Sequence, residues 1–236
     1  MREGGKMLAS VLETIRKTAK PGMAELEIAR LADKELAALG GKPVFKGYNG
    51  FPDVICISVN DEIVHGIPGD YEFKVGDLVG FDFGVNYKGL VTDSAFSMIF
   101  GQGSTEAHQL LSATEQSLKA AIGVLHDGVR VGDIGEAVES SLSLYDYGIV
   151  RELVGHGVGQ SMHEEPDIPN YGKAGTGPVL KEGMTIAIEP MVNLGTARVR
   201  MDPDGWTIRT ADGKISAHFE HTVLITEDGA EILTTL

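Results

Sequence analysis

The chain has 236 residues, 42% of them hydrophobic, which is enough for a substantial core in one domain. A net charge of −14 argues against nucleic-acid binding, and scattered Lys and Arg with no long apolar run argue against membrane attachment. One cysteine, Cys56, excludes an intrachain disulfide, and the polar N-terminus is unlike a signal peptide. We therefore expect a cytoplasmic protein.

Two amphipathic helices are predicted near the N-terminus. Apolar residues recur at helical spacing from Leu8 to Ile15, up to the breaker Pro21-Gly22. A second helical pattern runs from Ile28 to Leu39 and stops at Gly40-Gly41. Strand-like apolar runs follow at 54–59, 78–86 and 90–100.

The second part of the chain repeats this order. Helical patterns cover 111–125 and 134–142, and strand-like runs cover 149–154, 185–192 and 218–225. Residues 74–82 also match residues 181–189, because both have Lys-x-Gly, an apolar run and then an acidic residue. This repetition predicts two similar α/β halves, about 1–101 and 102–236, within a single domain 1–236. The acidic strands would meet at the seam between them.

Five side chains that could bind metal stand at or near strand ends: Asp82, Asp93, His156, Glu189 and Glu220. Four carboxylates in one site would repel each other and raise one another's pKa values. Two divalent cations would turn that repulsion into attraction and keep the carboxylates ionised. Carboxylates with one imidazole suit Mn, Fe(II), Co or Zn, whereas no zinc-type Cys or His spacing competes. The set predicts a metallohydrolase.

The two aspartates lie on the arms of a predicted hairpin. If its turn centres on Tyr87-Lys88, Asp82 and Asp93 are directly opposed, and a shift of one residue makes them diagonal neighbours. A hairpin with solvent-facing aspartates is the alternative. Glu189 and Glu220, taken singly, are better explained as ordinary exposed residues, because glutamate is rarely buried without a partner. The prediction therefore depends on the set.

The histidines differ in their neighbours. Glycines on both sides of His156 leave its imidazole unobstructed, and His163 and His65 lie in Gly- and Pro-rich loops that suit catalytic groups. His218 and His221 flank Glu220, and the sequence leaves open whether they support it.

Several motifs together resemble the type I methionine aminopeptidases of metallopeptidase family M24. The matching segments span nearly the whole chain: 47–52, 56–60, 65–68, 155–159, 163–166, 188–191, 204–207 and 219–222. The resemblance implies the α+β pita-bread fold, in which two pseudo-symmetric α/β halves form an antiparallel sheet flanked by helices.

The resemblance also implies a site with two divalent ions. Asp82 would bind one ion, His156 and Glu189 the other, and Asp93 and Glu220 would bridge them. A hydroxide held by the ions would attack the scissile carbonyl while Glu189 carries its proton. One ion would also bind the free α-amine.

Further positions would contact the substrate. His163 would stabilise the oxyanion, and His65 would contact the peptide nitrogen beyond the cleaved bond. The methionine side chain would enter an apolar pocket, lined by Tyr48, Phe51, Cys56, His65, Met162 and Trp206. Cys56 is equally well explained as a small buried strand residue.

Three departures from the family pattern stand out. Met162 replaces a bulky aromatic residue, so the pocket wall is expected to be softer. Ser94-Ala95-Phe96 follows Asp93 without the usual Arg, which puts the local packing in question. The chain also begins inside the family's first helix, so a short N-terminal segment is expected to be missing.

The expected function is removal of the initiator methionine from nascent proteins, with a small second residue favoured. The expected partners are nascent N-termini near the ribosome, and the protein is expected to be a monomer. An X-Pro aminopeptidase or prolidase, which shares fold and ligands, is the alternative enzyme. A partner-binding protein without activity is the third possibility, although such proteins typically lose metal ligands.

Overall fold

The helices lie where the helical periodicity predicts them, in a computed structural model that describes residues 1–236. They are α1 (Arg2–Thr18), α2 (Glu25–Leu39), α3 (Thr105–Gly123) and α4 (Val131–Leu142), with a short 3-10 turn η1 (Tyr48–Gly50). Gly40 ends α2 in the left-handed conformation that glycine adopts readily (φ 83°). Ser104 begins α3 by accepting a hydrogen bond from the backbone N–H of Ala107.

Nine strands form the largest sheet, and all of its strand pairs are antiparallel. The strands are β1 (Lys42–Pro43), β2 (Cys56–Val59), β4 (Leu78–Tyr87), β5 (Leu90–Ile99), β7 (Gly155–Gly157), β8 (Glu164–Ile168), β9 (Thr185–Ile188), β14 (Glu220–Thr226) and β15 (Gly229–Ile232). Their order is β1-β4-β5-β14-β9-β7-β8, with β2 beside β4 and β15 beside β14.

Two small antiparallel sheets complete the fold. One contains β6 (Gly148–Ile149), β10 (Met191–Asn193) and β13 (Ser216–His218), and the other contains β3 (Glu62–Val64), β11 (Val199–Met201) and β12 (Ile208–Thr210). The expected α+β class with an antiparallel sheet is confirmed.

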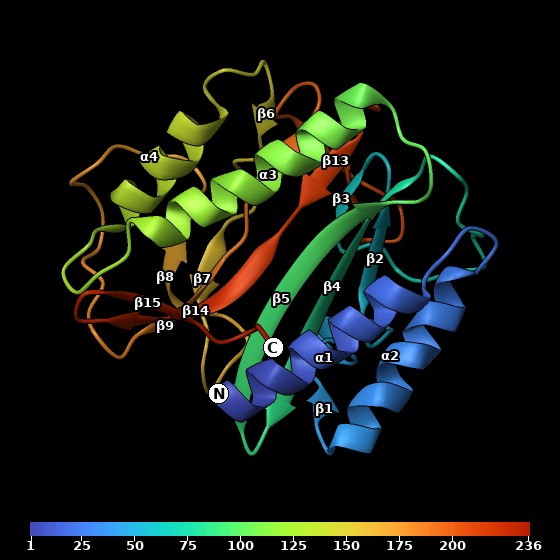
Figure 1. The fold of residues 1–236 in the computed structure, drawn as a ribbon, viewed down its shortest axis with the longest axis horizontal. Helices are drawn as coiled ribbons and strands as arrows, with labels where there is room; N and C mark the ends of the chain where they lie inside the picture. Colours follow the sequence, from blue (N-terminus) through green and yellow to red (C-terminus); the bar gives the residue numbers. More distant parts are fainter.

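Both helix pairs cover the same face of the large sheet. Figure 1 shows α1 in front of β4 and β5 with α2 beside α1, and α3 and α4 farther along the sheet. Between helices and sheet lies the largest apolar cluster, which includes Leu8, Phe81 and Val223. Burial of this face stabilises the fold, since each buried large apolar side chain contributes about 1.5–3 kcal/mol.

Two corresponding turns begin strands in the two predicted halves. Gly76 before β4 and Gly183 before β9 both have positive φ, 98° and 88°. In each turn the backbone N–H three residues after the lysine donates to the lysine carbonyl. The halves themselves stay a prediction.

Three expected strands differ from the prediction. Only Ile149 of the run 149–154 lies in a strand, β6, because the chain then leaves the small sheet to reach β7 in the large one. The run 185–192 is divided into β9 and β10 at Glu189-Pro190, since proline has no N–H for a ladder bond. The run 218–225 is likewise divided at Phe219, opposite Pro190.

The β4–β5 hairpin turns at Lys88-Gly89, one residue beyond the first of the two predicted registers. Both residues have positive φ (54° and 84°), as a type I′ turn requires. Asp82 therefore pairs with Ala95, and Asp93 pairs with Gly84. The aspartates are diagonal neighbours on the same face, and they do not point to solvent on a polar hairpin.

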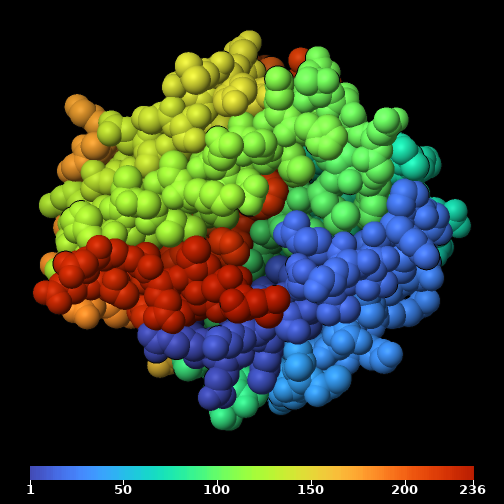
Figure 2. Space-filling model, in the orientation of Figure 1, coloured from blue at the N-terminus to red at the C-terminus, as the bar shows by residue number.

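The C-terminal segment crosses the helical face of the molecule. Figure 2 shows it between α1 and α3, where the surface is hollowed. The hollow is lined from α1, α3, β5, β14 and the chain end, including Arg16, Lys119, His221 and Leu236. None of the four helices combines the length and apolarity that crossing a bilayer would require.

Candidate metal centre and substrate pocket

The candidate ligands occupy two adjacent rows on the sheet face opposite the helices. Asp82, Ala95 and Glu220 form one row across β4, β5 and β14. Asp93 lies in the next row of β5, and His156 pairs with Ala187 of β9. Because alternate residues of a strand face the same side, these acidic side chains all project into one space.

Small residues between the ligands create that space. Ala95 lies between Asp82 and Glu220 in the first row, and Ala187 lies beside His156 in the second. Gly84 stands opposite Asp93, and a Cβ there would come within 2.8 Å of the Phe45 ring. These small residues therefore leave open space above the sheet between the ligands, and the Phe45 ring covers one end of that space.

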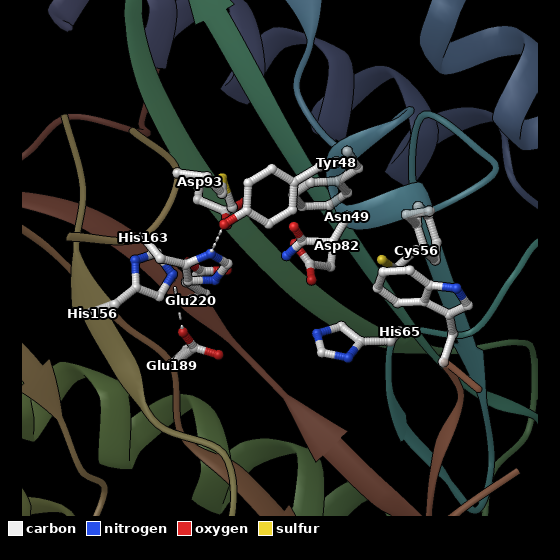
Figure 3. A pocket seen from close by; sticks show the side chains of 14 residues that line it. Tyr48, Asn49, Cys56, His65, Asp82, Asp93, His156, His163, Glu189 and Glu220 are labelled. Carbon is white, nitrogen blue, oxygen red and sulfur yellow. Dashed lines mark hydrogen bonds and ion pairs between the residues drawn. The ribbon is translucent and has the colours of Figure 1, made fainter. Parts of the chain in front are cut away.

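The ligating atoms are close together. One atom each from Asp93, His156 and Glu220 lies within 4.8 Å of the others. Glu189 joins this group, because its Oε1 is 3.5 Å from His156 Nε2 (Figure 3). Asp82 lies beside Asp93, whose charge is one cause of its raised pKa. The structure thus brings all five predicted ligands together.

Burial and mutual repulsion act on the four carboxyl groups. Burial raises the pKa of Asp93 to about 7. Burial and then the neighbouring carboxylates raise the pKa values of Asp82, Glu189 and Glu220 well above their ordinary range. Without a counter-charge the cluster resists full ionisation, which is the behaviour that the sequence predicts for such a set.

His156 is oriented as a ligand. Its Nδ1–H donates to the carbonyl oxygen of Gly157 at 2.8 Å, so the Nε2 lone pair faces the carboxylates. Burial lowers the pKa of His156 to about 4, which keeps the imidazole neutral near pH 7. A neutral imidazole with its lone pair directed at acidic groups is suited to bind a cation.

The donor set fits divalent cations. Asp82 Oδ1 and Glu220 Oε1 are buried without a hydrogen-bond partner, although such atoms are normally satisfied in proteins. Hard carboxylate oxygens and one nitrogen suit Mn, Fe, Co or Zn. Binding of cations would satisfy the unpartnered oxygens and offset the repulsion.

A cavity of about 190 Å³ adjoins the cluster. It is lined by Phe45, Tyr48, Asn49, Phe51, Cys56, His65, Asp82, Asp93, His156, Met162, His163, Glu189, Trp206 and Glu220. Every site residue predicted from the sequence is therefore among the residues that line this cavity. Figure 3 shows acidic groups on one side of it and Cys56 with His65 on the other.

Aromatic and sulfur-containing side chains form the apolar wall. Phe51 meets Trp206 edge-to-face with ring centroids 5.2 Å apart, and Phe45 meets Phe51 at 6.4 Å. Met162 and Cys56 are buried beside them. Cys56 is thus both a buried strand residue and a cavity residue, and burial raises its pKa well above the ordinary value, so the thiol stays protonated.

The two other histidines enter from loops. His163 Nδ1 is 2.8 Å from the hydroxyl of Tyr48, a hydrogen bond that links two distant loops across the cavity (Figure 3). His65 has positive φ (60°), an unusual conformation for a non-glycine residue. Hydrogen bonds from Gly66 and Gly69 to Ser58 and Glu25 hold that loop in place.

Sequence reasoning missed two cavity residues and left two histidines undecided. Asn49 lies inside a recognised motif, and its positive φ (48°) is typical of asparagine in turns. Phe45 lies in a loop with no periodic pattern to reveal it. His218 faces the site, whereas His221 faces the helices and bonds to Thr234.

The residues around the family departures pack well. Met162 is buried in the cavity wall. Ser94 donates a hydrogen bond from Oγ to the Glu220 carbonyl oxygen at 2.7 Å. The ring of Phe96 lies under the guanidinium of Arg16, 4.0 Å from the ring centroid.

Comparison with known proteins agrees with this geometry. The model of metallopeptidase family M24 matches residues 1–227. Methionine aminopeptidase 1 of Bacillus subtilis is 45% identical over 99% of this chain and 94% of its own length. The methionine aminopeptidase of Clostridium perfringens is 43% identical over 100% and 95%.

The fold agrees equally well. The crystal structure of methionine aminopeptidase from Thermotoga maritima superposes with a TM-score of 0.98 at 44% identity, covering 100% of this chain and 95% of that one. This confirms the pita-bread fold expected from the resemblance. The chain therefore belongs to metallopeptidase family M24, among its methionine aminopeptidases.

Proposed function

We propose that this protein removes the N-terminal methionine from peptides and nascent proteins, with a small second residue preferred. The observation that carries the proposal is the single cavity that joins a buried acidic cluster to an apolar wall. An unbranched thioether side chain suits such a wall, and the acidic cluster suits the metal-dependent hydrolysis of the family. Nascent chains near the ribosome, in the cytoplasm, would be the substrates of a monomeric enzyme.

Two divalent cations, of Co, Mn, Fe or Zn, would be held by the five clustered ligands. These ligands would be Asp82, Asp93, His156, Glu189 and Glu220, which the structure brings together. When bound, such cations polarise a carbonyl group and lower the pKa of water.

Glu189 is the best-placed proton carrier. Its carboxylate lines the cavity at the edge of the acidic cluster, with Oε1 3.5 Å from His156 Nε2. A carboxylate in that place can take a proton from the attacking water and return it to the leaving nitrogen. Removal of the negative charge at Glu189 would therefore impair the chemical step.

His163 would stabilise the oxyanion through Nε2. The hydrogen bond between Tyr48 and His163 Nδ1 fixes the ring orientation and leaves Nε2 for the cavity. His65 reaches the cavity from the side of Cys56, and it would bind the peptide nitrogen beyond the cleaved bond. Tyr48, Phe51, Cys56, His65, Met162 and Trp206 would surround the methionine side chain.

A peptide assay tests the proposal. Metal-loaded protein would be incubated with Met-Gly-Met and with an X-Pro tripeptide, beside a Glu189→Gln variant prepared in the same way. We expect methionine release from Met-Gly-Met by the wild-type protein and a large loss in the variant. No release with Co, Mn, Fe or Zn would overturn the proposal, and cleavage of X-Pro peptides alone would favour the prolidase alternative.

A further inference from the structure

His218 is a buried histidine that faces the candidate metal centre without lining the cavity. Its side chain is 4% exposed, and its Nε2 has no hydrogen-bond partner. That nitrogen lies 3.8 Å from Oε2 of Glu189. Buried polar atoms are rarely left unpaired, so an unpartnered nitrogen directed at a carboxylate calls for an explanation.

The strand register determines this position. His218 pairs with Met191, and His221 pairs with Ile188, so the same antiparallel register runs past the break at Pro190. Since residues two apart share a face, His218 lies on the same side as Glu220. Glu189 is then the diagonal neighbour of His218 across the two strands.

The backbone of His218 is fixed from the neighbouring strand. The His218 N–H donates to Ser97 Oγ at 3.0 Å, and the Ser97 hydroxyl interacts with the His218 carbonyl oxygen at 2.8 Å. Both contacts are buried. The imidazole is therefore presented from a rigid part of the sheet, as a group that orients another side chain should be.

Glu189 lies between two imidazoles. His156 Nε2 is 3.5 Å from Oε1 of Glu189, and His218 Nε2 is 3.8 Å from Oε2. The two histidines thus lie near different oxygens of the Glu189 carboxylate. The lone pair of His156 Nε2 is directed at the cluster, so His156 cannot donate a hydrogen bond from that atom. A donor for Glu189 must come from the other side.

We propose that His218 is a positioning residue whose Nε2–H donates to Oε2 of Glu189 and leaves Oε1 directed at the metal centre. The proposal rests on the function proposed above in so far as Glu189 carries the proton. Charge-assisted N–H···O bonds are about 2.8 Å long, so a side-chain movement of about 1 Å forms this one. Outer partners of this kind orient metal ligands and raise their basicity.

The imidazole of His218 has an N–H to donate. An imidazole carries at least one ring N–H, and the neighbouring Glu189 carboxylate favours its placement on Nε2, which has no other partner. The proposed bond therefore requires only a small movement of the side chain.

Two substitutions separate the role of the His218 N–H as a hydrogen-bond donor from the role of the side chain's volume. His218→Leu removes the donor, whereas His218→Gln retains one on a flexible side chain. We expect His218→Leu to lower kcat on Met-Gly-Met and the Mn²⁺ affinity of the metal-free protein by about 10- to 100-fold each. KM should change little, because His218 does not line the cavity. His218→Gln should recover most of both losses.

His221→Leu is the matched control. It makes the same change at the other histidine beside Glu220, on the face directed toward the helices, where Nδ1 bonds to Thr234. We expect kcat and Mn²⁺ affinity close to wild type in this variant, even if its thermal stability falls. Calorimetric titration with Mn²⁺ gives the affinity without reference to turnover.

A crystal structure of the wild-type protein with Mn²⁺ provides an independent measurement. The proposal predicts a His218 Nε2–Glu189 Oε2 distance below about 3.2 Å, and a distance beyond about 3.5 Å would overturn it. Wild-type kcat and affinity in folded His218→Leu, or equal losses in His218→Leu and His218→Gln, would overturn it as well. If the wild-type protein releases no methionine, the proposed function fails, while affinity and distance still decide the role of His218.

Discussion

The two faces formed by β5, β13 and β14 differ in chemistry although their residues alternate along the same strands. On the cavity face, Asp93, His218 and Glu220 are buried, and His218 Nε2 and Glu220 Oε1 lack hydrogen-bond partners. On the helical face, His221 bonds to Thr234 and Ser94 bonds to the Glu220 carbonyl. His221 and Ser94 thus have partners within the protein, whereas the unpartnered atoms of His218 and Glu220 on the cavity face are free for a ligand.

Stability and function are located on different faces of these strands. Polar groups that are buried without partners oppose folding, so the cavity face destabilises the protein in the absence of cations. The helical face packs apolar side chains against α1 and α3 and stabilises it. Substitutions on the two faces should therefore have opposite consequences for activity and stability.

Loss of a metal ligand should have the largest effect. Glu220→Gln removes a charge from the repelling cluster, so the metal-free variant should unfold at a higher temperature than the wild type. Activity should fall by at least about 10³-fold, more than the 10- to 100-fold typical of outer partners. Calorimetry and Met-Gly-Met turnover measure the two effects. A variant that is both less stable and active would contradict the contrast between the faces.

His163→Ala should come next. It removes the proposed oxyanion donor from the cavity without touching the acidic cluster, so kcat should fall by about 10²-fold. Mn²⁺ affinity should change far less than in Glu220→Gln. Steady-state kinetics and calorimetry test this, and an equal loss of metal affinity would assign His163 to the metal centre instead.

The stability of the metal-free protein should depend on pH in a defined direction. Burial raises the pKa of Asp93 to about 7, and burial with the neighbouring carboxylates raises the pKa values of Asp82, Glu189 and Glu220 well above their ordinary range. The folded state then retains protons that the unfolded state has released, so stability is greatest at low pH and is lost as pH rises through the folded pKa values.

The dependence of stability on the raised carboxyl pKa values is best measured between pH 6.5 and 8. Below this range, the buried histidines with lowered pKa values act in the opposite sense. Within this range, the free energy of unfolding should fall by about 1.4 kcal/mol per pH unit for each carboxyl group still protonated in the folded state. Urea denaturation measures the slope. Saturating Mn²⁺ should abolish it, and a stability that rises with pH in the metal-free protein would refute the account.

Tyr48→Phe should have a smaller effect on the cavity side. It removes only the hydroxyl that bonds to His163 Nδ1, and a single hydrogen bond contributes about 0.5–1.5 kcal/mol. We expect kcat to fall by about 10-fold or less, with the fold unchanged. The matched variant Phe51→Leu should instead raise KM, because it trims the apolar wall. Unchanged kcat in Tyr48→Phe would show that the bond does not orient His163.

Ser94→Ala on the helical face should have the smallest effect on activity. Loss of the hydrogen bond to the Glu220 carbonyl should lower the free energy of unfolding by about 1 kcal/mol. Turnover of Met-Gly-Met should stay near wild type. A large loss of activity with unchanged stability would mean that the two faces are not separable.

The sequence predicts the long elements because they have long periodic patterns. Helical spacing locates α1 to α4, and apolar runs locate β4 and β5. Strands of two or three residues, such as β6 and β11, carry no such signal. The break of two runs at Glu189-Pro190 and at Phe219 depends on the partner strand, which the local sequence does not specify.

The sequence predicts those parts of the site where both the residue type and its position in a strand indicate a ligand. The cluster of five ligands follows from acidic residues at strand ends, but its register depends on a turn at Lys88-Gly89. Phe45 reaches the site through packing, so no local pattern reveals it, and cross-strand pairing decides which of the two histidines beside Glu220 faces the site. The register of the hairpin and the residues added to the site by packing therefore depend on tertiary contacts, which the local sequence does not specify.

Anomalous diffraction from crystals of Mn²⁺-loaded protein locates cations without any assumption about activity. We expect two anomalous peaks on the cavity face, in contact with Asp82, Asp93, His156, Glu189 and Glu220, and none in the hollow beside His221. If no peak lies on the cavity face, or if peaks lie on the helical face alone, the five residues do not form a metal centre.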